Sequence, residues 1–221
     1  MSSGVKAILG VLIVFFVGVW FGYEELKPKK NLPVFHPADV KPQLVDSSLH
    51  ASNRAHYIAP FELINQYGDT VTEDMFDGAI YVADFFFTTC RSICPKMTSQ
   101  MERIQTAYKH ENGVKLLSHS VTPEKDSVSV LLDYAAQYGA KKNKWHLVTG
   151  PKKHIYDLAR KSYFAVLDHG DGGAQDFIHT ENFVLVDTNR QIRGFYDGTS
   201  EEEVNQLMAD IAWLLEEGNK D

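Results

Sequence analysis

The chain has only two cysteines, Cys90 and Cys94, which stand four positions apart in the segment TTCRSICPKM. Two thiols at this spacing can form a disulfide, act as a redox-active dithiol or bind a soft metal ion. A disulfide across four residues closes a small loop and restricts the unfolded chain little, so a purely structural bridge contributes little stability. The spacing therefore favours a functional pair and leaves redox chemistry and metal binding open.

The residues around the cysteines predict a strand that leads into a helix. Tyr81–Phe87 is a short apolar run, and its length favours a buried strand. After Pro95, apolar side chains recur at helical spacing, at Met97, Met101 and Ile104. We expect the helix to begin near Pro95, because proline suits the first turn of a helix. The positive end of the helix dipole would then favour the thiolate forms of both cysteines.

Hydrophobic periodicity predicts the other elements of one α/β domain. A hairpin around the turn Gln66–Asp69 comes first. Further strands are predicted at Val114–Val121, Trp145–Val148, Phe177–Asp187 and Asn189–Tyr196, and helices at Ser127–Tyr138, Pro151–Lys161 and Glu201–Glu217. Strands and helices that alternate and then give way to a hairpin and a helix are typical of a thioredoxin-like α/β fold, here with an N-terminal β-hairpin extension.

The last predicted helix, Glu201–Glu217, is amphipathic. Ser200 is the expected N-cap, and Glu203 would complete a capping box with it. We expect five apolar side chains to face the core: Val204, Leu207, Met208, Ile211 and Leu215.

The N-terminal segment predicts a transmembrane helix that anchors the chain to a membrane. Ala7–Tyr23 is an uncharged apolar run after Lys6, close to the roughly 20 residues that a spanning helix needs. No A-x-A-like site follows it, which favours an uncleaved anchor over a cleaved signal peptide. We therefore divide the chain into an anchor at residues 1–23, a tether at 24–55 and a thioredoxin-like domain at 56–221. Charge counting does not decide the orientation of the anchor.

The net charge of the 221-residue chain bears on its partners. The formal net charge is −7, and the body of the chain has no long basic run, so the composition argues against nucleic acid as a partner. Two cysteines are also too few for a disulfide-stapled scaffold.

Two of the nine histidines are candidates to join the cysteines. His179 is expected near the start of the Phe177–Asp187 strand, which in a thioredoxin-like sheet would run beside the end of the cysteine-bearing strand. His169 lies in the preceding glycine-rich loop and is the second candidate, whereas His119, on a predicted strand, fits a satisfied core or edge side chain better than a ligand. Two thiolates and one imidazole suit copper, while a structural zinc site needs a fourth ligand.

Four segments resemble the Sco/SenC family, the membrane-anchored, thioredoxin-like copper chaperones of cytochrome c oxidase assembly. TTCRSICPKM resembles the family's C-x-x-x-C-P signature, and SVTPEKDSVSVLLDYAAQYG resembles its S-V-D-P-E-x-D segment. WHLVTGPKKHIYDLARKSYF resembles its L-T-G helix segment, and IHTENFVLVD its histidine-bearing strand. The resemblance covers roughly Ala59 to Leu215, and four segments in the right order are more specific than any one of them.

The resemblance implies that Cys90, Cys94 and His179 bind a copper ion. It implies a metallochaperone with its soluble domain on the extracytoplasmic (periplasmic) side, which helps load the CuA centre of cytochrome c oxidase subunit II. A thiol reductant or another copper carrier would be a further partner. Thr122 stands where the family usually has aspartate, and Ile178 where a polar residue is common. Both differences bear on the groups that orient the ligands.

A membrane-anchored thiol–disulfide oxidoreductase is the alternative function. It would reduce the cysteines of the oxidase subunit or of another extracytoplasmic protein, with Cys90 and Cys94 as its catalytic residues. Such enzymes usually have two residues between the cysteines, whereas this chain has three and an available histidine. A peroxidase of the thioredoxin superfamily fits less well, because Phe87 stands where the peroxiredoxin pattern has threonine. The spacing therefore favours metal binding.

Overall fold

The computed structural model describes residues 3–26, 31–37, 56–166, 170, 172–173 and 175–218. The chain divides into two units, Met1–Leu32 and Pro33–Asp221. In the first unit, α1 (Ser3–Leu26) exposes large apolar side chains between Leu12 and Phe21. Among the described residues, no helix combines the length and the hydropathy that a membrane span requires, so the predicted transmembrane helix is not confirmed.

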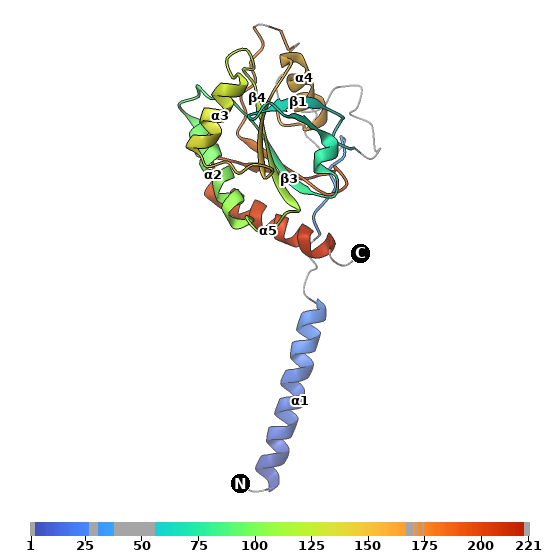
Figure 1. Ribbon diagram of the computed structural model, residues 1–221. Helices are drawn as coiled ribbons and strands as arrows, with labels where there is room; N and C mark the ends of the chain where they lie inside the picture. The colour runs from blue at the N-terminus through green and yellow to red at the C-terminus, as the bar shows by residue number, and fades with distance from the viewer. Residues whose placement is uncertain are drawn as a thin grey trace. The chain divides into compact units, whose positions relative to one another are not determined.

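The described part of the second unit is built on a seven-stranded mixed sheet with the strand order β2-β1-β5-β4-β3-β6-β7 (Figure 1). β4 pairs in parallel with β3 and β5, whereas the other neighbouring strands are antiparallel. The strands are β1 (Glu62–Asn65), β2 (Thr70–Thr72), β3 (Ile80–Phe86), β4 (Val114–Ser120), β5 (Trp145–Thr149), β6 (Asn182–Val186) and β7 (Ile192–Asp197). The predicted thioredoxin-like fold with an N-terminal hairpin, β1–β2, is confirmed.

The helices connect these strands and pack on the sheet. They are α2 (Ile93–Ala107), α3 (Val128–Gln137), α4 (Lys152–Asp157), which continues into the π-helical turn η3 (Leu158–Ser162), and α5 (Glu201–Gly218). A short 3-10 helix, η2 (Glu73–Phe76), follows β2. α2 and α5 lie side by side, where the Tyr108 hydroxyl donates to the carbonyl oxygen of Met208 (Figure 1).

β3 is an interior strand between β4 and β6, and all seven of its residues are buried. Successive side chains of a strand point to opposite faces, so one strand can serve two halves of a core. Phe85 belongs to the same apolar cluster as Ile155 and Tyr156 of α4. Phe86 instead contacts Tyr134 of α3, with ring centroids 5.3 Å apart. β3 therefore leads into the cysteine segment from a position that is packed on both sides.

The structure corrects the start of two predicted elements. The strand predicted at Phe177–Asp187 begins only at Asn182, so His179 precedes β6 by three residues. The reason is that Thr180 donates its hydroxyl to the carbonyl oxygen of Ala165 rather than pairing with a strand. The helix predicted near Pro95 begins at Ile93, which brings Cys94 into its first turn.

The predicted inward face of α5 is right in part. Val204, Leu207 and Ile211 are buried, whereas Met208 and Leu215 are only half-buried. Asp210 and Leu214 face inward as well. The buried Asp210 carboxylate accepts a hydrogen bond from the Tyr196 hydroxyl at 2.6 Å.

The predicted capping box of α5 is half formed. The Ser200 hydroxyl accepts from Glu203 N at 3.3 Å, as expected for an N-cap. The Glu203 carboxylate, however, accepts from Asp197 N rather than from Ser200 N.

The described residues 33–37 lie against β7. Phe35 N donates to the carbonyl oxygen of Ile192 at 2.9 Å, and Arg193 Nε donates to that of Pro33 at 3.0 Å. The rings of Phe35 and Phe195 also meet edge to face, with centroids 5.3 Å apart. Residues 38–55 lie outside the described residues, so the tether stays a prediction.

Candidate functional site

The two cysteines are close to each other at the connection between β3 and α2. Cys94 N, in the first turn of α2, donates to the Cys90 sulfur at 3.4 Å. The Ser92 hydroxyl lies 3.6 Å from the same sulfur, and Cys90 N donates to the carbonyl oxygen of Phe87 at 3.2 Å. Both cysteines are free thiols. The helix N-terminus thus supplies the Cys90 sulfur with donors that it cannot use within its own helix.

The two thiols differ strongly in acidity. Burial raises the pKa of Cys90, but hydrogen bonds from the Cys94 thiol, from the backbone at Ser92 and Cys94 and from the Ser92 hydroxyl outweigh it, and the pKa falls from 9.0 to about 7. Burial, together with the neighbouring Cys90, raises the pKa of Cys94 to about 12. At neutral pH, Cys90 is therefore the nucleophile and the ready ligand, while Cys94 keeps its proton.

The buried carboxylate of Asp126 accepts hydrogen bonds from the start of the cysteine segment, at Thr88. Asp126 has no exposed surface. Its oxygens accept from the Thr88 hydroxyl at 2.5 Å, from Thr88 N at 3.3 Å, from the Ser120 hydroxyl at 2.6 Å and from the Thr122 hydroxyl at 3.0 Å. Thr88 stands two residues before Cys90, so Asp126 ties the approach to the thiols to the end of β4.

No role was predicted for Asp126, although it lies in the segment SVTPEKD that carries part of the family resemblance. The structure also explains Thr122, which stands in place of the family's usual aspartate. A second carboxyl group at this position would be a like charge beside Asp126, whereas the Thr122 hydroxyl is a donor to it. Thr122 thus contributes a hydrogen bond to Asp126 and is not one of the proposed ligands.

His179 lies on a segment whose side chains alternate between the interior and the solvent. Ile178 and Thr180 are buried, whereas Phe177 is 46% exposed and His179 is exposed too. Alternation along an extended chain places positions 177 and 179 on the same side. Phe177 in turn meets Phe87 edge to face, with ring centroids 5.2 Å apart. The segment that bears His179 therefore contacts the cysteine segment through Phe177.

The structure does not gather the three predicted ligands into one cluster. No group of three His, Cys, Asp or Glu side chains close enough to hold a metal ion occurs within the described residues. Cys90 and Cys94 are together, and His179 is an exposed side chain on the adjoining segment. The second candidate, His169, lies outside the described residues.

His119 is a buried core residue, as predicted. It stacks on Phe85 with ring centroids 4.7 Å apart, and its Nδ1 lies 3.2 Å from the carbonyl oxygen of Asp84. Burial lowers the pKa of His119 to about 4, so the ring is neutral at physiological pH. Within the described residues, its Nε2 atom has no hydrogen-bond partner.

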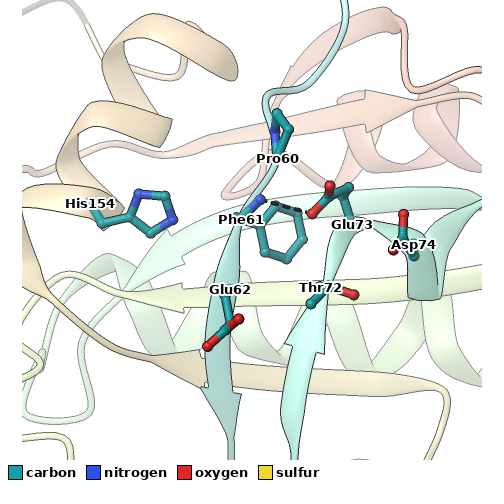
Figure 2. Close-up of a pocket in the computed structure, with 7 residues that line it drawn as sticks. All are labelled: Pro60, Phe61, Glu62, Thr72, Glu73, Asp74 and His154. Atoms are coloured by element: carbon teal, nitrogen blue, oxygen red, sulfur yellow. Dashed lines mark hydrogen bonds between the residues drawn. The ribbon is translucent and has the colours of Figure 1, made fainter.

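A pocket at the β1–β2 hairpin is lined by Pro60, Phe61, Glu62, Thr72, Glu73, Asp74 and His154 (Figure 2). Glu73, which projects into it, accepts a hydrogen bond from Phe61 N at 2.9 Å (Figure 2). The carboxylate thus bonds to the backbone at the start of β1. Neither cysteine is among the residues that line this pocket, so it is separate from the dithiol site.

The fold and the dithiol define a thioredoxin-like protein with a C-x-x-x-C pair at the N-terminus of a helix. The model of the SCO1/SenC family matches residues 50–216, and the chain belongs to this family. The predicted family membership is confirmed.

The relatives resemble the chain over most of their own length. A SCO1 protein homolog from Bacillus subtilis is 33% identical over 156 residues, which cover 70% of this chain and 80% of the homolog. A SCO1/SenC family lipoprotein from Bacillus anthracis is 28% identical, with a TM-score of 0.64 and coverage of 72% of this chain and 95% of its own. BsSco, a member of the Sco family of cytochrome c oxidase assembly proteins with a disulfide switch, is 32% identical, with a TM-score of 0.61 and coverage of 72% and 92%.

Sco homologues have been solved with copper bound. One is ScoI from Bradyrhizobium japonicum, which is 21% identical, has a TM-score of 0.58 and covers 72% of this chain and 99% of its own. At 21% identity, this similarity shows a shared fold and nothing further.

Proposed function

We propose that the protein is a copper-binding metallochaperone that holds its cargo with Cys90, Cys94 and His179. In this proposal it helps assemble the CuA centre of cytochrome c oxidase subunit II. The observation that carries the proposal is the pair of adjacent free thiols at the start of α2, beside the segment that bears His179. Thiolate sulfur selects Cu(I), and imidazole is compatible with it. Family membership and the copper-bound relatives support this choice of metal.

The thiol acidities define how copper would bind. Cys90, with a pKa of about 7, offers a thiolate near neutral pH, whereas Cys94, with a pKa of about 12, must release a proton when it binds the metal. Copper uptake should therefore release at least one proton and strengthen as the pH rises. His179 is the most exposed of the three groups, so a target ligand can replace it first when copper is passed on.

A thiol–disulfide oxidoreductase is the second candidate, and the same asymmetry of the thiols supports it. The Cys90 thiolate would attack a disulfide of the target and form a mixed disulfide, and the target's first thiol would leave. Cys94 would then attack Cys90, release the second target thiol and leave a Cys90–Cys94 disulfide. The target gains two electrons and two protons, and an external thiol reductant must regenerate the dithiol.

We also infer that the N-terminal segment attaches the protein to the outer face of a membrane, with residues 1–23 as the anchor and residues 24–55 as the tether. The exposed apolar side chains of α1 and the lipoprotein from Bacillus anthracis support this inference. Deletion of residues 1–23 should move the protein from the washed membrane fraction to the soluble extract. Retention of the shortened chain on the membrane would contradict the inference.

Copper titration of the reduced, full-length protein against a Cu(I) chelator of known affinity tests the main proposal. The wild type should bind one copper ion. Cys90→Ser, Cys94→Ser and His179→Ala should each weaken binding by more than about 100-fold, because changes outside the ligand set already cost roughly 10- to 100-fold. His110→Ala, at an exposed histidine in the turn after α2, is the matched control and should bind like the wild type.

Reduction of an oxidised fragment of oxidase subunit II by the metal-free protein separates the two functions. His179→Ala should keep any reductase activity, since the dithiol is intact, and lose tight copper binding. If His179→Ala instead binds copper like the wild type, His179 is not a ligand. If the wild type reduces the fragment and binds no copper, the oxidoreductase function replaces the chaperone function.

A further inference from the structure

The segment that carries His179 is held at its start by a buried ion pair. Arg160 Nη1 donates to Asp176 Oδ2 at 2.6 Å, and Arg160 Nη2 donates to Asp176 Oδ1 at 2.8 Å. The side chains of Arg160 and Asp176 are only 11% and 7% exposed. Two parallel bonds between a guanidinium and a carboxylate fix the direction of both groups, which a single charge contact does not.

Two glycines before this segment, Gly170 and Gly172, lie close to the same carboxylate. Gly172 N donates to Asp176 Oδ2 at 2.7 Å. A Cβ atom at Gly170 would lie 2.2 Å from Asp176 Oδ2, closer than real contacts allow, so the backbone approaches the carboxylate at a distance that only glycine permits. The Asp176 carboxylate is therefore in contact with the backbone of Gly170 and Gly172 and with the Arg160 guanidinium.

Arg160 itself lies in an irregular stretch of backbone. It belongs to the π-helical turn Leu158–Ser162, a rare arrangement that is frequent at functional sites. Two residues after this turn, the buried Phe164 adopts a φ of 49°, in the left-handed region that bulky residues avoid. Such conformations are unfavourable and persist where the surrounding structure requires them. The irregular stretch therefore has a positional role.

The irregular stretch also holds the other end of the histidine segment. The Thr180 hydroxyl donates to the carbonyl oxygen of Ala165 at 2.7 Å, and Asn182 Nδ2 donates to the same oxygen at 2.9 Å. His179 thus lies between two anchors, Asp176 and Thr180, that bind the same neighbouring stretch. Its backbone is restrained while its ring remains exposed.

A chain of contacts links this arrangement to the cysteine segment. The Tyr156 hydroxyl donates to the carbonyl oxygen of Val121 at 2.9 Å and lies 3.4 Å from that of Asp176. Val121 N donates to the carbonyl oxygen of Phe86, the last residue of β3. A series of contacts through Tyr156 and Val121 therefore connects Asp176 to the end of β3, which precedes the cysteines.

We propose that Arg160 and Asp176 are a positioning pair that sets the place of the His179 imidazole relative to the two thiols. The pair touches no metal and acts through the segment that it holds. This inference rests on the proposed copper site. It assigns copper affinity to an ion pair in the fold, in addition to the three ligands.

Copper titration of full-length variants tests the proposal. Asp176→Asn keeps the size of the side chain and removes its charge, and Arg160→Lys keeps the charge and removes the fork. Each should weaken Cu(I) binding by about 10- to 100-fold, as changes to groups that orient ligands do. The matched control is Asp157→Asn, because Asp157 bonds Lys153 and Lys161 on the exposed side of α4. It should change the affinity by less than about threefold, since exposed ion pairs contribute little.

A double-mutant cycle separates positioning from general damage. In the His179→Ala background, Asp176→Asn should weaken copper binding no further, because the group that it positions is gone. Thermal unfolding shows which variants are folded at the temperature of the titration. If Asp176→Asn is unfolded there, Arg160→Lys, the milder change, replaces it in the cycle.

The outcomes distinguish this proposal from the one on which it rests. Wild-type affinity in both Asp176→Asn and Arg160→Lys, with weak binding in His179→Ala, overturns the positioning role alone. An equal loss with and without His179 overturns it as well, because the pair would then act on the fold as a whole. A wild type that binds no copper overturns both proposals.

Discussion

The cysteine segment and the histidine segment are each held by a buried carboxylate, but the two carboxylates have different partners. Asp126 accepts hydrogen bonds from the backbone and from neutral hydroxyl groups of threonine and serine. Asp176 is bound by a guanidinium and by the backbone of a glycine-rich loop. The first carboxylate anchors thiols that are themselves buried, whereas the second anchors the backbone beneath an exposed ring.

This difference suits the roles that we propose for the two segments. The thiols differ in acidity because short, fixed contacts with Ser92 and Cys94 surround Cys90, and such contacts require a rigid backbone. An imidazole that binds a metal and then dissociates from it needs a backbone that is held in place and a ring that is accessible to solvent and partners. A metallochaperone can thereby keep two donors constant and exchange the third.

The largest expected effect is the difference in reactivity between the thiols. At pH 7 the Cys90 thiolate is about half populated, whereas Cys94 is almost entirely protonated, so brief treatment with iodoacetamide should modify Cys90 at least about 100-fold faster. The rate at Cys90 should rise as the pH passes 7 and then level off. Peptide mapping by mass spectrometry measures both sites, and equal rates at the two cysteines would contradict the assigned acidities.

Removal of the carboxylate beneath the cysteine segment should have the next largest effect. Asp126→Ala leaves the donors of Thr88, Ser120 and Thr122 without their acceptor, which should lower the free energy of unfolding by at least about 3 kcal/mol. It should also change the alkylation rate of Cys90, which Asp176→Asn should leave unaltered. Urea unfolding gives the stability, and Asp133→Ala, at an exposed position of α3, should stay within about 0.5 kcal/mol of the wild type.

Acid should destabilise the sheet beneath the cysteine segment rather than the ion pair of the histidine segment. Burial lowers the pKa of His119 to about 4, below its unfolded value of 6.5, so the unfolded chain binds the proton first and stability falls between pH 6.5 and 4. The loss from His119 alone is about 3 kcal/mol at pH 4. The Arg160 guanidinium holds the pKa of Asp176 below its ordinary value, so the ion pair weakens only at still lower pH.

Two other buried groups, His146 and Asp84, also change the free energy of unfolding between pH 4 and 7. Burial lowers the pKa of His146 to about 4, which adds to the loss in acid. Burial raises the pKa of Asp84 to about 7, so its contribution to stability is present below its unfolded value of 3.8 and is lost as the pH rises through 7. Urea midpoints between pH 4 and 7 should therefore vary less in His119→Leu and more in Asp84→Asn. An unchanged profile in His119→Leu would contradict the assignment.

The smallest expected effect concerns the contact between the two segments. Phe177→Leu removes an edge-to-face ring contact with Phe87, which contributes about 0.5–1.5 kcal/mol. Copper affinity should fall by up to about tenfold, and the free energy of unfolding should fall by no more than about 1.5 kcal/mol, because Phe177 is half-exposed and the ring contact is the main interaction lost. Tyr57→Leu, at an exposed aromatic residue, should leave copper affinity at the wild-type value. A larger loss than that of Asp176→Asn would make this contact the main positioning element.

Residue types and their spacing were enough to predict the secondary-structure elements and the dithiol. The apolar run Tyr81–Phe87 and the helical spacing after Pro95 predicted β3 and α2, because the period of a pattern is a local property. The C-x-x-x-C pair and the four ordered segments predicted the SCO1/SenC family, which is confirmed. The predicted start of β6 at Phe177 was wrong: β6 begins at Asn182, and no local pattern shows that the Thr180 hydroxyl bonds the carbonyl oxygen of Ala165.

The tertiary structure alone decided how the site is held. Asp126 lies 38 positions from Thr88, and Asp176 lies 16 positions from Arg160. No local pattern indicates which donors meet a carboxylate across such separations. The contacts that lower the pKa of Cys90 are local, to Ser92 and Cys94, whereas the raised pKa of Cys94 follows mainly from its burial in the folded domain. Residue types and spacing could predict the kind of chemistry, whereas the folding of distant segments onto one another determined the position and protonation of each group.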